Sequence, residues 1–178
     1  IPGFHTSCSI TDFKKNVEDI GISIMEQSEE ICPADRKIYP LRDLTNTVAS
    51  IPLICGSIMS KKIAEGIGAL VLDIKVGNGA FMKDLNSAKQ LSKKLQSIAN
   101  DNNIKIKTIY SNMNQVLGNT AGLYCEILES IDILRGEGAE DLKLLVKNIA
   151  CTCLRLSGVS NPTTKVNEAI SSGEAYEK

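Results

Sequence analysis

The feature that most constrains the fold is a pair of strand-like runs separated by a helical pattern in the middle of the chain. The run ALVLDIKV (69–76) is nearly continuous in apolar residues, which is typical of a strand in a parallel sheet covered on both faces. A glycine-rich segment, GNGAFM, precedes an amphipathic helical pattern at 85–102, and the strand-like run IKIKTIYS (104–111) follows. This alternation predicts an α/β domain with a mixed, mostly parallel sheet flanked by helices.

Other periodic segments extend this prediction to the rest of the chain. The alternating run ISIMEQ (22–27) predicts one more strand. In the 85–102 helix the residues expected to face inward are Leu85, Leu91, Leu95 and Ile98. Further helices are expected at 11–21, 34–43, 52–66, 120–136, 140–158 and 163–173.

Two prolines and one helical insertion shape the predicted organisation. We expect Pro40 to stop its helix, whereas Pro52 lies either in the first turn of the next helix or at a kink in it. Residues 34–65 form a purely helical insertion between strands and are assigned to a smaller all-α domain. Residues 1–33 and 66–178 are assigned to the α/β domain.

Composition excludes several classes of function. The chain has 178 residues, of which 43% are hydrophobic and 23% charged. Its net charge is −1, and the sequence contains no cluster of basic residues. These values argue against a nucleic-acid or anionic-membrane surface. No run of 18 apolar residues exists, so no membrane span is expected.

The cysteines indicate reduced, mostly buried thiols in a cytoplasmic protein. None of the six forms a CxxC pair, and the single histidine, His5, cannot complete a zinc pattern with them. The six are Cys8, Cys32, Cys55, Cys125, Cys151 and Cys153.

A mixed face is predicted on the helix that follows Pro52. Successive residues of an α-helix rotate by about 100°, which places Ile54, Ser57, Ile58 and Lys61 in one sector. Apolar walls with a hydroxyl and an ammonium suit a flat heterocycle that has a polar edge. The same pattern also fits a Lys61 that extends into solvent and a Ser57 that bonds a backbone carbonyl one turn earlier.

Several motifs resemble one known family. The segments YPLRDLTNTVASIPLICGSIMSKKIAEG, ALVLDIKVGNGAFM and SNMNQVLGNTAG, in this order, resemble the pyrimidine-nucleoside phosphorylase and thymidine phosphorylase family. The segments IPGF and CPADRKIY resemble it too, so the likeness covers essentially the whole chain.

The resemblance implies a reaction and a set of contacts. Members cleave uridine, thymidine or deoxyuridine with inorganic phosphate as co-substrate and without a cofactor, giving the base and a ribose or deoxyribose 1-phosphate. The base contacts it implies are Arg42, Ser57 and Lys61, of which Arg42 and Lys61 are the expected catalytic residues. Its implied apolar contacts are Ile54, Ile58 and Phe81.

The resemblance also implies a structural cation, K⁺, held by the carbonyls of Leu117 and Thr120 and the side chain of Glu129. From the residues alone, Glu129 fits equally an exposed helix carboxylate, because oxygen-only cation sites leave little signature. The GNGAF loop has two glycines and no P-loop lysine, so we favour a strand-to-helix turn that carries Phe81 over a phosphate cradle.

The two ends bear on activity. The chain begins with IPGF and ends with SSGEAYEK, and we expect it to be the central, base-binding part of a longer, homodimeric enzyme that is inactive alone. The phosphate contacts implied by the resemblance lie upstream of Ile1. The alternatives are a non-catalytic scaffold and a phosphoribosyltransferase relative, for which no acidic metal cluster is present in the sequence.

Overall fold

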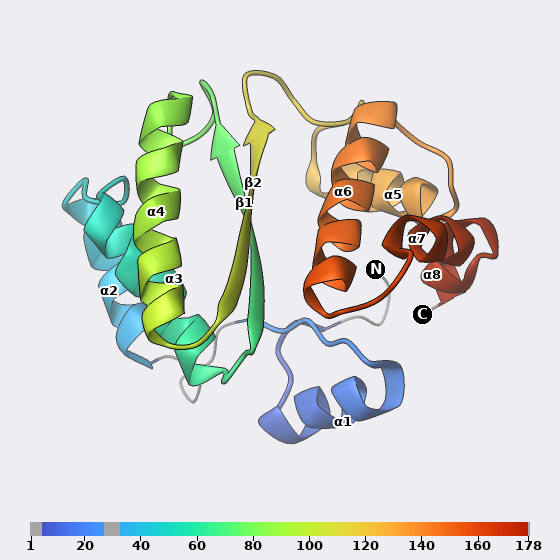
Figure 1. Ribbon diagram of the computed structural model, residues 1–178, viewed down its shortest axis with the longest axis horizontal. Helices are drawn as coiled ribbons and strands as arrows, with labels where there is room; N and C mark the ends of the chain where they lie inside the picture. Colours follow the sequence, from blue (N-terminus) through green and yellow to red (C-terminus); the bar gives the residue numbers. More distant parts are fainter. Residues whose placement is uncertain (1–4, 27–32, 178) are drawn as a thin grey trace. The chain divides into compact units, whose positions relative to one another are not determined.

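The computed structural model describes residues 5–26 and 33–177, and the chain divides into two compact units (Figure 1). The first unit is Ile1–Ser50 and the second is Ile51–Lys178. The assignment of 34–65 to a separate all-α domain stays a prediction. The opening IPGF motif lies outside the described residues.

The first unit contains α1 (Ile10–Ile20), which confirms the predicted helix. The side chain of Ser9 caps it by accepting a hydrogen bond from the backbone N–H of Asp12, and the helix ends at Gly21 in the left-handed region (φ 90°). The strand predicted at 22–27 is wrong over 22–26, and Gln27 lies outside the described part. Ile22 is 62% exposed, because this alternating segment pairs with no strand among the residues that the structure describes.

The second helix of this unit, α2 (Pro33–Leu44), continues through Pro40. The prediction that Pro40 stops the helix is therefore wrong. Proline has no N–H to donate and so removes one helical hydrogen bond, but its fixed φ is compatible with the helix.

The second unit confirms the predicted elements of the rest of the chain. Pro52 occupies the first turn of its helix and not a kink. In chain order the elements are α3 (Ile51–Ala64), β1 (Ala69–Val76), α4 (Leu85–Asp101), β2 (Lys105–Asn112), α5 (Leu123–Leu134), α6 (Glu140–Leu156), α7 (Pro162–Ser171) and α8 (Glu174–Glu177).

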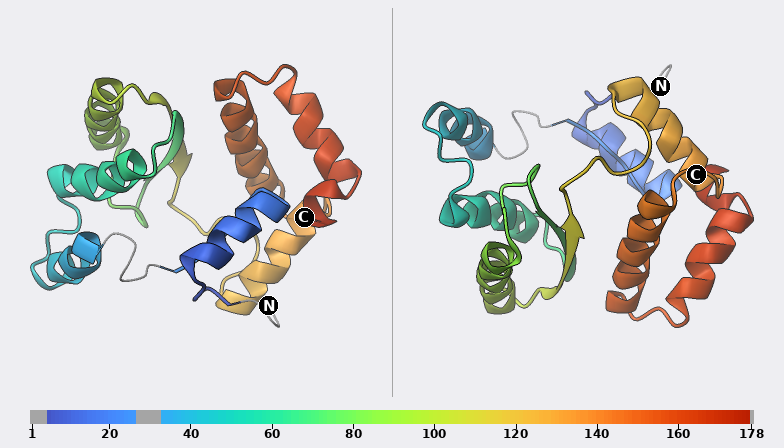
Figure 2. Two further views of the ribbon diagram at one scale, coloured as in Figure 1. Left: turned by 90° about the horizontal axis from the view of Figure 1, so that it is seen from below. Right: turned by 90° about the horizontal axis from the view of Figure 1, so that it is seen from above.

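The centre of the second unit is a parallel pair of strands. β1 pairs with β2 in a register that runs from Ala69 opposite Lys105 to Val76 opposite Asn112. Because parallel strands need a crossover, α4 joins them and packs on one face of the sheet, while α6 contacts both strands from the other face (Figures 1 and 2). This arrangement confirms the predicted α/β class.

The core lies between the sheet and the helices α3 and α4. Leu91 and Leu95 point inward as predicted, whereas Leu85, at the start of α4, is 45% exposed. In β1 only Ile74 is buried and the other residues are half-buried, because the sheet has two strands in the described part of the chain. The full burial expected of this strand is therefore not reached. The buried core residues are Ile54, Cys55, Met59, Ile74, Met82, Ala88, Leu91, Leu95, Ala99 and Ile104.

The cysteines are less buried than predicted. Among the described residues all cysteines are free thiols, but only Cys55 and Cys151 are buried, whereas Cys125 and Cys153 are exposed on their helices. Cys32 lies outside the described residues.

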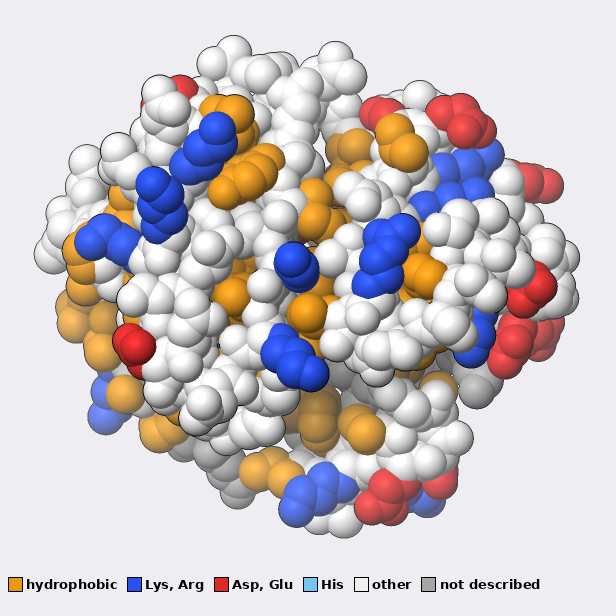
Figure 3. All heavy atoms as spheres, viewed as in Figure 1, with side chains coloured by type: hydrophobic (Ala, Val, Ile, Leu, Met, Phe, Trp, Pro, Cys, Tyr) orange, Lys and Arg blue, Asp and Glu red, His pale blue; other side chains and the backbone are white. Residues whose placement is uncertain are grey.

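The surface agrees with the composition. No helix in the described ranges is long and apolar enough to cross a lipid bilayer. Figure 3 shows Lys and Arg side chains scattered over α4 and α6, with hydrophobic and uncharged side chains between them. This face has no single basic patch of the kind that nucleic acid requires.

The cap of α4 gives a pH-dependent prediction. Asp84 accepts hydrogen bonds from the N–H groups of Asn86 and Ser87 and from the Ser87 hydroxyl. The bonds from Ser87, above all that of its hydroxyl, hold the pKa of Asp84 below its usual value. The cap therefore stabilises the fold fully above the unfolded-state pKa of about 3.9 and is lost as pH falls through the lower folded-state pKa.

We expect Asp84→Ala to lower the free energy of unfolding at pH 7 and the difference from the unsubstituted protein to shrink below pH 4. Urea unfolding followed at a series of pH values measures this. Ser87→Ala, which removes one donor and keeps the carboxylate, should show a smaller effect of the same sign. A difference that is constant from pH 7 to pH 3 would contradict the assignment.

Candidate functional site

The helix α3 brings two of the predicted polar residues together. Ser57 and Lys61 are one turn apart, and the Lys61 ammonium donates a hydrogen bond to the Ser57 hydroxyl over 3.1 Å. The two side chains thus share a face, as helical spacing predicts. The neighbouring Lys62 instead pairs with Glu65 over 2.9 Å. The two lysines, although adjacent in sequence, therefore point to different faces of the helix and have different partners.

The three predicted apolar contacts line one pocket of about 200 Å³. Ile54 and Ile58 contribute from α3, and Phe81 contributes from the loop after β1 with 60% of its surface exposed. The other lining residues are Leu72, Asp73, Ile74, Lys75, Met82, Leu91 and Leu95. One wall of this pocket is thus the helix that carries Ser57 and Lys61.

The loop that carries Phe81 is held by hydrogen bonds from its backbone N–H groups, two of which go to the segment after β2. The N–H groups of Gly77 and Gly79 donate to the carbonyls of Met82 and Met113, at 3.0 and 2.9 Å, and that of Asn78 donates to the Asn114 side chain. These N–H groups are engaged within the protein, which argues against a phosphate cradle. A Cβ on Gly77 (φ 138°) would lie 2.7 Å from the Asn114 side chain, so the close approach requires glycine here.

A polar group in this pocket was not singled out from the sequence as part of a site. Asp73 pairs with Lys75 over 2.6 Å and accepts a hydrogen bond from the Ser111 hydroxyl over 2.6 Å. Asp73 and Lys75 are two apart in β1, and so they share one face of the strand. The spacing of two residues could have indicated the Asp73–Lys75 pair from the sequence. The hydrogen bond from Ser111 of β2 could not be foreseen, because it depends on the register of the two strands.

Arg42 belongs to the first unit. It is 5% exposed, its Nη2 donates to the carbonyl of Val48 over 2.6 Å, and its guanidinium lies 5.7 Å from the centre of the Tyr39 ring. Its Nε is buried and has no hydrogen-bond partner among the described residues. The prediction that Arg42 and Lys61 meet one ligand stays a prediction, because the two residues lie in different units.

The thiol of Cys55, on α3, is not activated as a nucleophile. Burial raises the pKa of Cys55, which keeps the thiol protonated at neutral pH. The second unit thus offers ammonium and hydroxyl donors beside apolar walls. This combination of groups suits a flat ligand that has a polar edge.

Two of the three residues of the predicted cation site are in contact: Glu129 of α5 and Thr120 of the loop before it. Glu129 is 8% exposed, and its carboxylate accepts hydrogen bonds from the Asn119 N–H at 2.7 Å and the Thr120 hydroxyl at 3.0 Å. The interpretation of Glu129 as an exposed helix carboxylate is therefore wrong. The side chain lies against the loop that carries the carbonyls of Leu117 and Thr120.

This donor set fits a cation that prefers oxygen ligands. A carboxylate offers about four lone-pair directions, and the two hydrogen bonds to Glu129 leave further capacity to accept. No group of three or more His, Cys, Asp and Glu side chains that could hold a metal ion occurs in the ranges that the structure describes. A site here would therefore depend mainly on backbone carbonyls.

The sequence is similar to known proteins over its whole length. Residues 1–176 match the glycosyl transferase family, a/b domain. The whole chain is 42% identical to a thymidine phosphorylase of Colwellia psychrerythraea and 46% identical to a pyrimidine-nucleoside phosphorylase of Staphylococcus haemolyticus. It covers 42% of each of these relatives. Over 82% of the chain, the identity to a pyrimidine-nucleoside phosphorylase of Geobacillus stearothermophilus is 50%, and 34% of that relative is covered.

The packing of Glu129 against its loop gives a prediction. Gly118 has a positive φ of 77°, and a Cβ there would lie 2.5 Å from the Glu129 carboxylate. We expect Gly118→Ala to lower the free energy of unfolding by about 1–3 kcal/mol, through backbone strain and the clash.

Gly158→Ala is the matched control, because Gly158 has a similar φ of 80° and no atom within 4 Å of the added Cβ. Denaturant unfolding of both variants separates backbone strain from the clash. Equal losses at the two positions would contradict a close packing of Glu129 on this loop.

Proposed function

The chain belongs to the glycosyl transferase family, a/b domain, and we propose that the protein containing it cleaves pyrimidine nucleosides with inorganic phosphate. The names of the relatives, thymidine phosphorylase and pyrimidine-nucleoside phosphorylase, support this reaction. The chain spans less than half of their length, so it supplies only part of such an enzyme. Its part in the reaction is to bind the base.

The observation that carries the proposal is the mixed face of α3. Ile54 and Ile58 line the pocket that Phe81 also borders, and the hydrogen-bonded pair Ser57–Lys61 lies within one turn of both isoleucines. A pyrimidine has two apolar faces and an edge of carbonyl and imide groups. The apolar side chains would hold the faces, while Lys61 donates to a carbonyl and Ser57 bonds the imide edge.

This placement fits the charges that develop during phosphorolysis. The C1′–N1 bond breaks with its electron pair moving to the base, and a phosphate oxygen forms the new bond to C1′. Negative charge therefore grows on the base carbonyls and positive charge on the sugar. An ammonium already in place beside a carbonyl stabilises that state more than the ground state, and this difference accelerates the reaction.

Arg42 supplies the second cation in this proposal. Its guanidinium donates to the carbonyl of Val48 and lies near the Tyr39 ring. A guanidinium carries further N–H donors, one of which would donate to a base carbonyl in this proposal. Phosphate is the nucleophile, so the reaction needs no covalent catalysis by the cysteines of this chain.

Substitution of Lys61 tests the proposal in the full protein. We expect Lys61→Ala to lower kcat/KM for the phosphate-dependent release of uracil and thymine from their nucleosides by about 10²–10³-fold, the usual loss for one such donor. Lys62→Ala is the matched control, because Lys62 pairs with Glu65 on another face of the same helix and should leave the rate nearly unchanged.

The assay also separates the alternatives. Unchanged turnover in the Lys61→Ala protein would rule out the role of this side chain. Base release that does not require phosphate, or no release at all by the full protein, would rule out phosphorolysis. Transfer of a phosphoribosyl group from a diphosphate ester would instead indicate a phosphoribosyltransferase.

We further propose that K⁺ binds at the carbonyls of Leu117 and Thr120 and the carboxylate of Glu129. When bound, the cation would tie α5 to its preceding loop. By linkage, K⁺ at a hundred times its Kd stabilises the fold by about 2.7 kcal/mol.

Thermal unfolding in KCl and in tetramethylammonium chloride at equal ionic strength measures this effect. We expect the Tm to be higher in KCl and the difference to vanish in Glu129→Gln. Glu126→Gln, one turn earlier on α5, removes a carboxylate that accepts from the Gly122 N–H and should retain the difference. Equal Tm values of the unsubstituted protein in both salts would exclude the cation site.

A further inference from the structure

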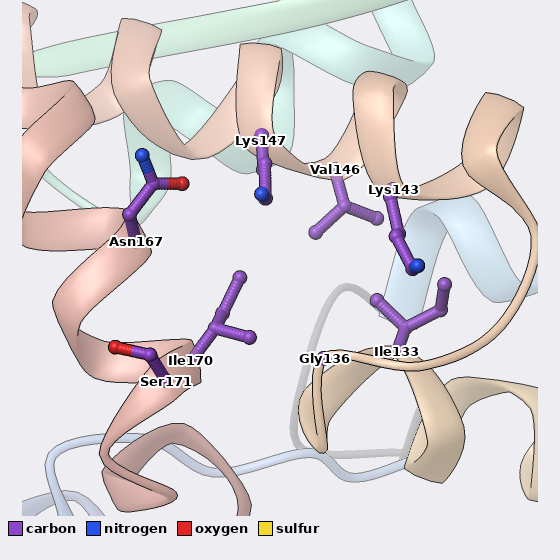
Figure 4. Close-up of a pocket in the computed structure, with 8 residues that line it drawn as sticks. All are labelled: Ile133, Gly136, Lys143, Val146, Lys147, Asn167, Ile170 and Ser171. Carbon is purple, nitrogen blue, oxygen red and sulfur yellow. The ribbon is translucent and has the colours of Figure 1, made fainter.

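A second pocket of the second unit has no role in the proposed reaction. It encloses about 390 Å³ where the end of α5 meets α6 and α7 (Figure 4). It shares no lining residue with the pocket beside α3. Its volume lies within the range of pockets that bind small organic molecules.

The floor of this pocket is apolar. Ile133 of α5 is 4% exposed, and Val146 of α6 and Ile170 of α7 complete the floor. Figure 4 shows the three side chains directed toward one another from their separate helices. The floor can therefore accept a small apolar body.

One wall of the pocket is cationic. Lys143 and Lys147 lie one turn apart on α6 and both line the pocket. The side chain of Lys143 is only 18% exposed, and its ammonium lies 2.8 Å from the carboxylate of Glu140. The residues that line the pocket thus include two lysines and no acidic residue, so the lining carries an excess of positive charge.

Helix α7 adds a neutral polar group. Asn167 of α7 lines the pocket, and Figure 4 shows its side-chain amide on the side of α6 and Lys147. Ser171 lines the pocket too, but its hydroxyl is directed away from it and donates to the carbonyl of Glu168 over 3.3 Å. The amide of Asn167 offers a donor and an acceptor without changing the charge. The pocket therefore combines an apolar floor, two cations and a hydrogen-bonding amide.

We propose that this pocket binds an organic anion that has a small apolar body and one carboxylate or phosphate group. The apolar body would lie on the isoleucines and Val146, and the anionic group would accept hydrogen bonds from Lys147 and Lys143. Hydrogen bonds between ammonium and carboxylate or phosphate groups are among the strong ones in proteins. The proposal does not depend on the proposed reaction.

Glu140 competes with the ligand in this arrangement. Its side chain is 88% exposed, and exposed ion pairs contribute little to stability, so Lys143 can exchange this partner for a ligand at small cost. The hydrogen bond from Lys143 also lowers the pKa of Glu140, so the carboxylate stays charged at neutral pH. Removal of this charge should therefore strengthen anion binding.

Methyl NMR of the full protein with labelled isoleucine and valine tests the proposal. The probes are benzoate and phenyl phosphate, which distinguish a carboxylate from a phosphate ligand, and benzamide, a neutral molecule of the same shape. We expect at least one anion to shift the signals of Ile133, Val146 and Ile170 in a saturable manner, whereas benzamide does not. Equal shifts with benzamide, or no shift with either anion, would overturn the proposal.

Three variants test the charges. Lys147→Met should weaken binding of the anion by roughly tenfold or more, the effect of one hydrogen bond to a charged group, and Glu140→Gln should strengthen it. Lys165→Met is the control, because Lys165 is exposed on α7 and does not line the pocket. Unchanged affinity in both Lys147→Met and Glu140→Gln would contradict the proposal. If Lys147→Met does not fold, Lys147→Gln and the gain in Glu140→Gln decide it.

Discussion

The parallel pairing of β1 with β2 is the constraint on which the rest of the second unit depends. Two parallel strands cannot be joined by a tight turn, so the chain must cross over through α4 and begin β2 at the same end as β1. Both strands then finish at one edge, where the loop after β1 meets the segment after β2. The hydrogen bonds from Gly79 to Met113 and from Asn78 to Asn114 follow from this meeting. They fix the loop that carries Phe81.

Helix α3, which lies next to this sheet, carries both core residues and several of the predicted base contacts. α3 buries Met59, which is 1% exposed, in the shared core and packs against α4. Burial of that side chain sets the rotation of the helix, so Ile54 and Ile58 line the pocket and the Ser57–Lys61 pair lies within one turn of them. Packing energy thus orients polar groups that contribute little to stability themselves. Because the core residues hold the helix, the residues on its other face can bind a ligand without a change in fold.

The buried carboxylate of Glu129 organises the loop before α5 in a different way. A charge in this position needs hydrogen bonds, and the loop supplies them from Asn119 and Thr120. Gly118 is needed because any side chain would occupy the space of the carboxylate. The resemblance implied a cation ligand at Glu129 and the residues alone fitted an exposed carboxylate equally well, since burial depends on which segment covers a residue.

The sequence by itself determined the α/β class, most helices and the shared face of Ser57 and Lys61, because hydrophobic period and helical rotation are local properties. Predictions from the sequence were wrong where a local pattern forms its expected structure only in contact with a distant segment. The run after α1 alternates like a strand but joins no sheet in the described part of the chain, and Pro40 lies within a helix that continues past it. Only the tertiary structure decided that β1 is half-buried, that Ser111 reaches Asp73, and that lysines of α6 face a pocket. These features join segments far apart in the chain, and their contacts depend on strand register and helix packing, which no short stretch of sequence specifies.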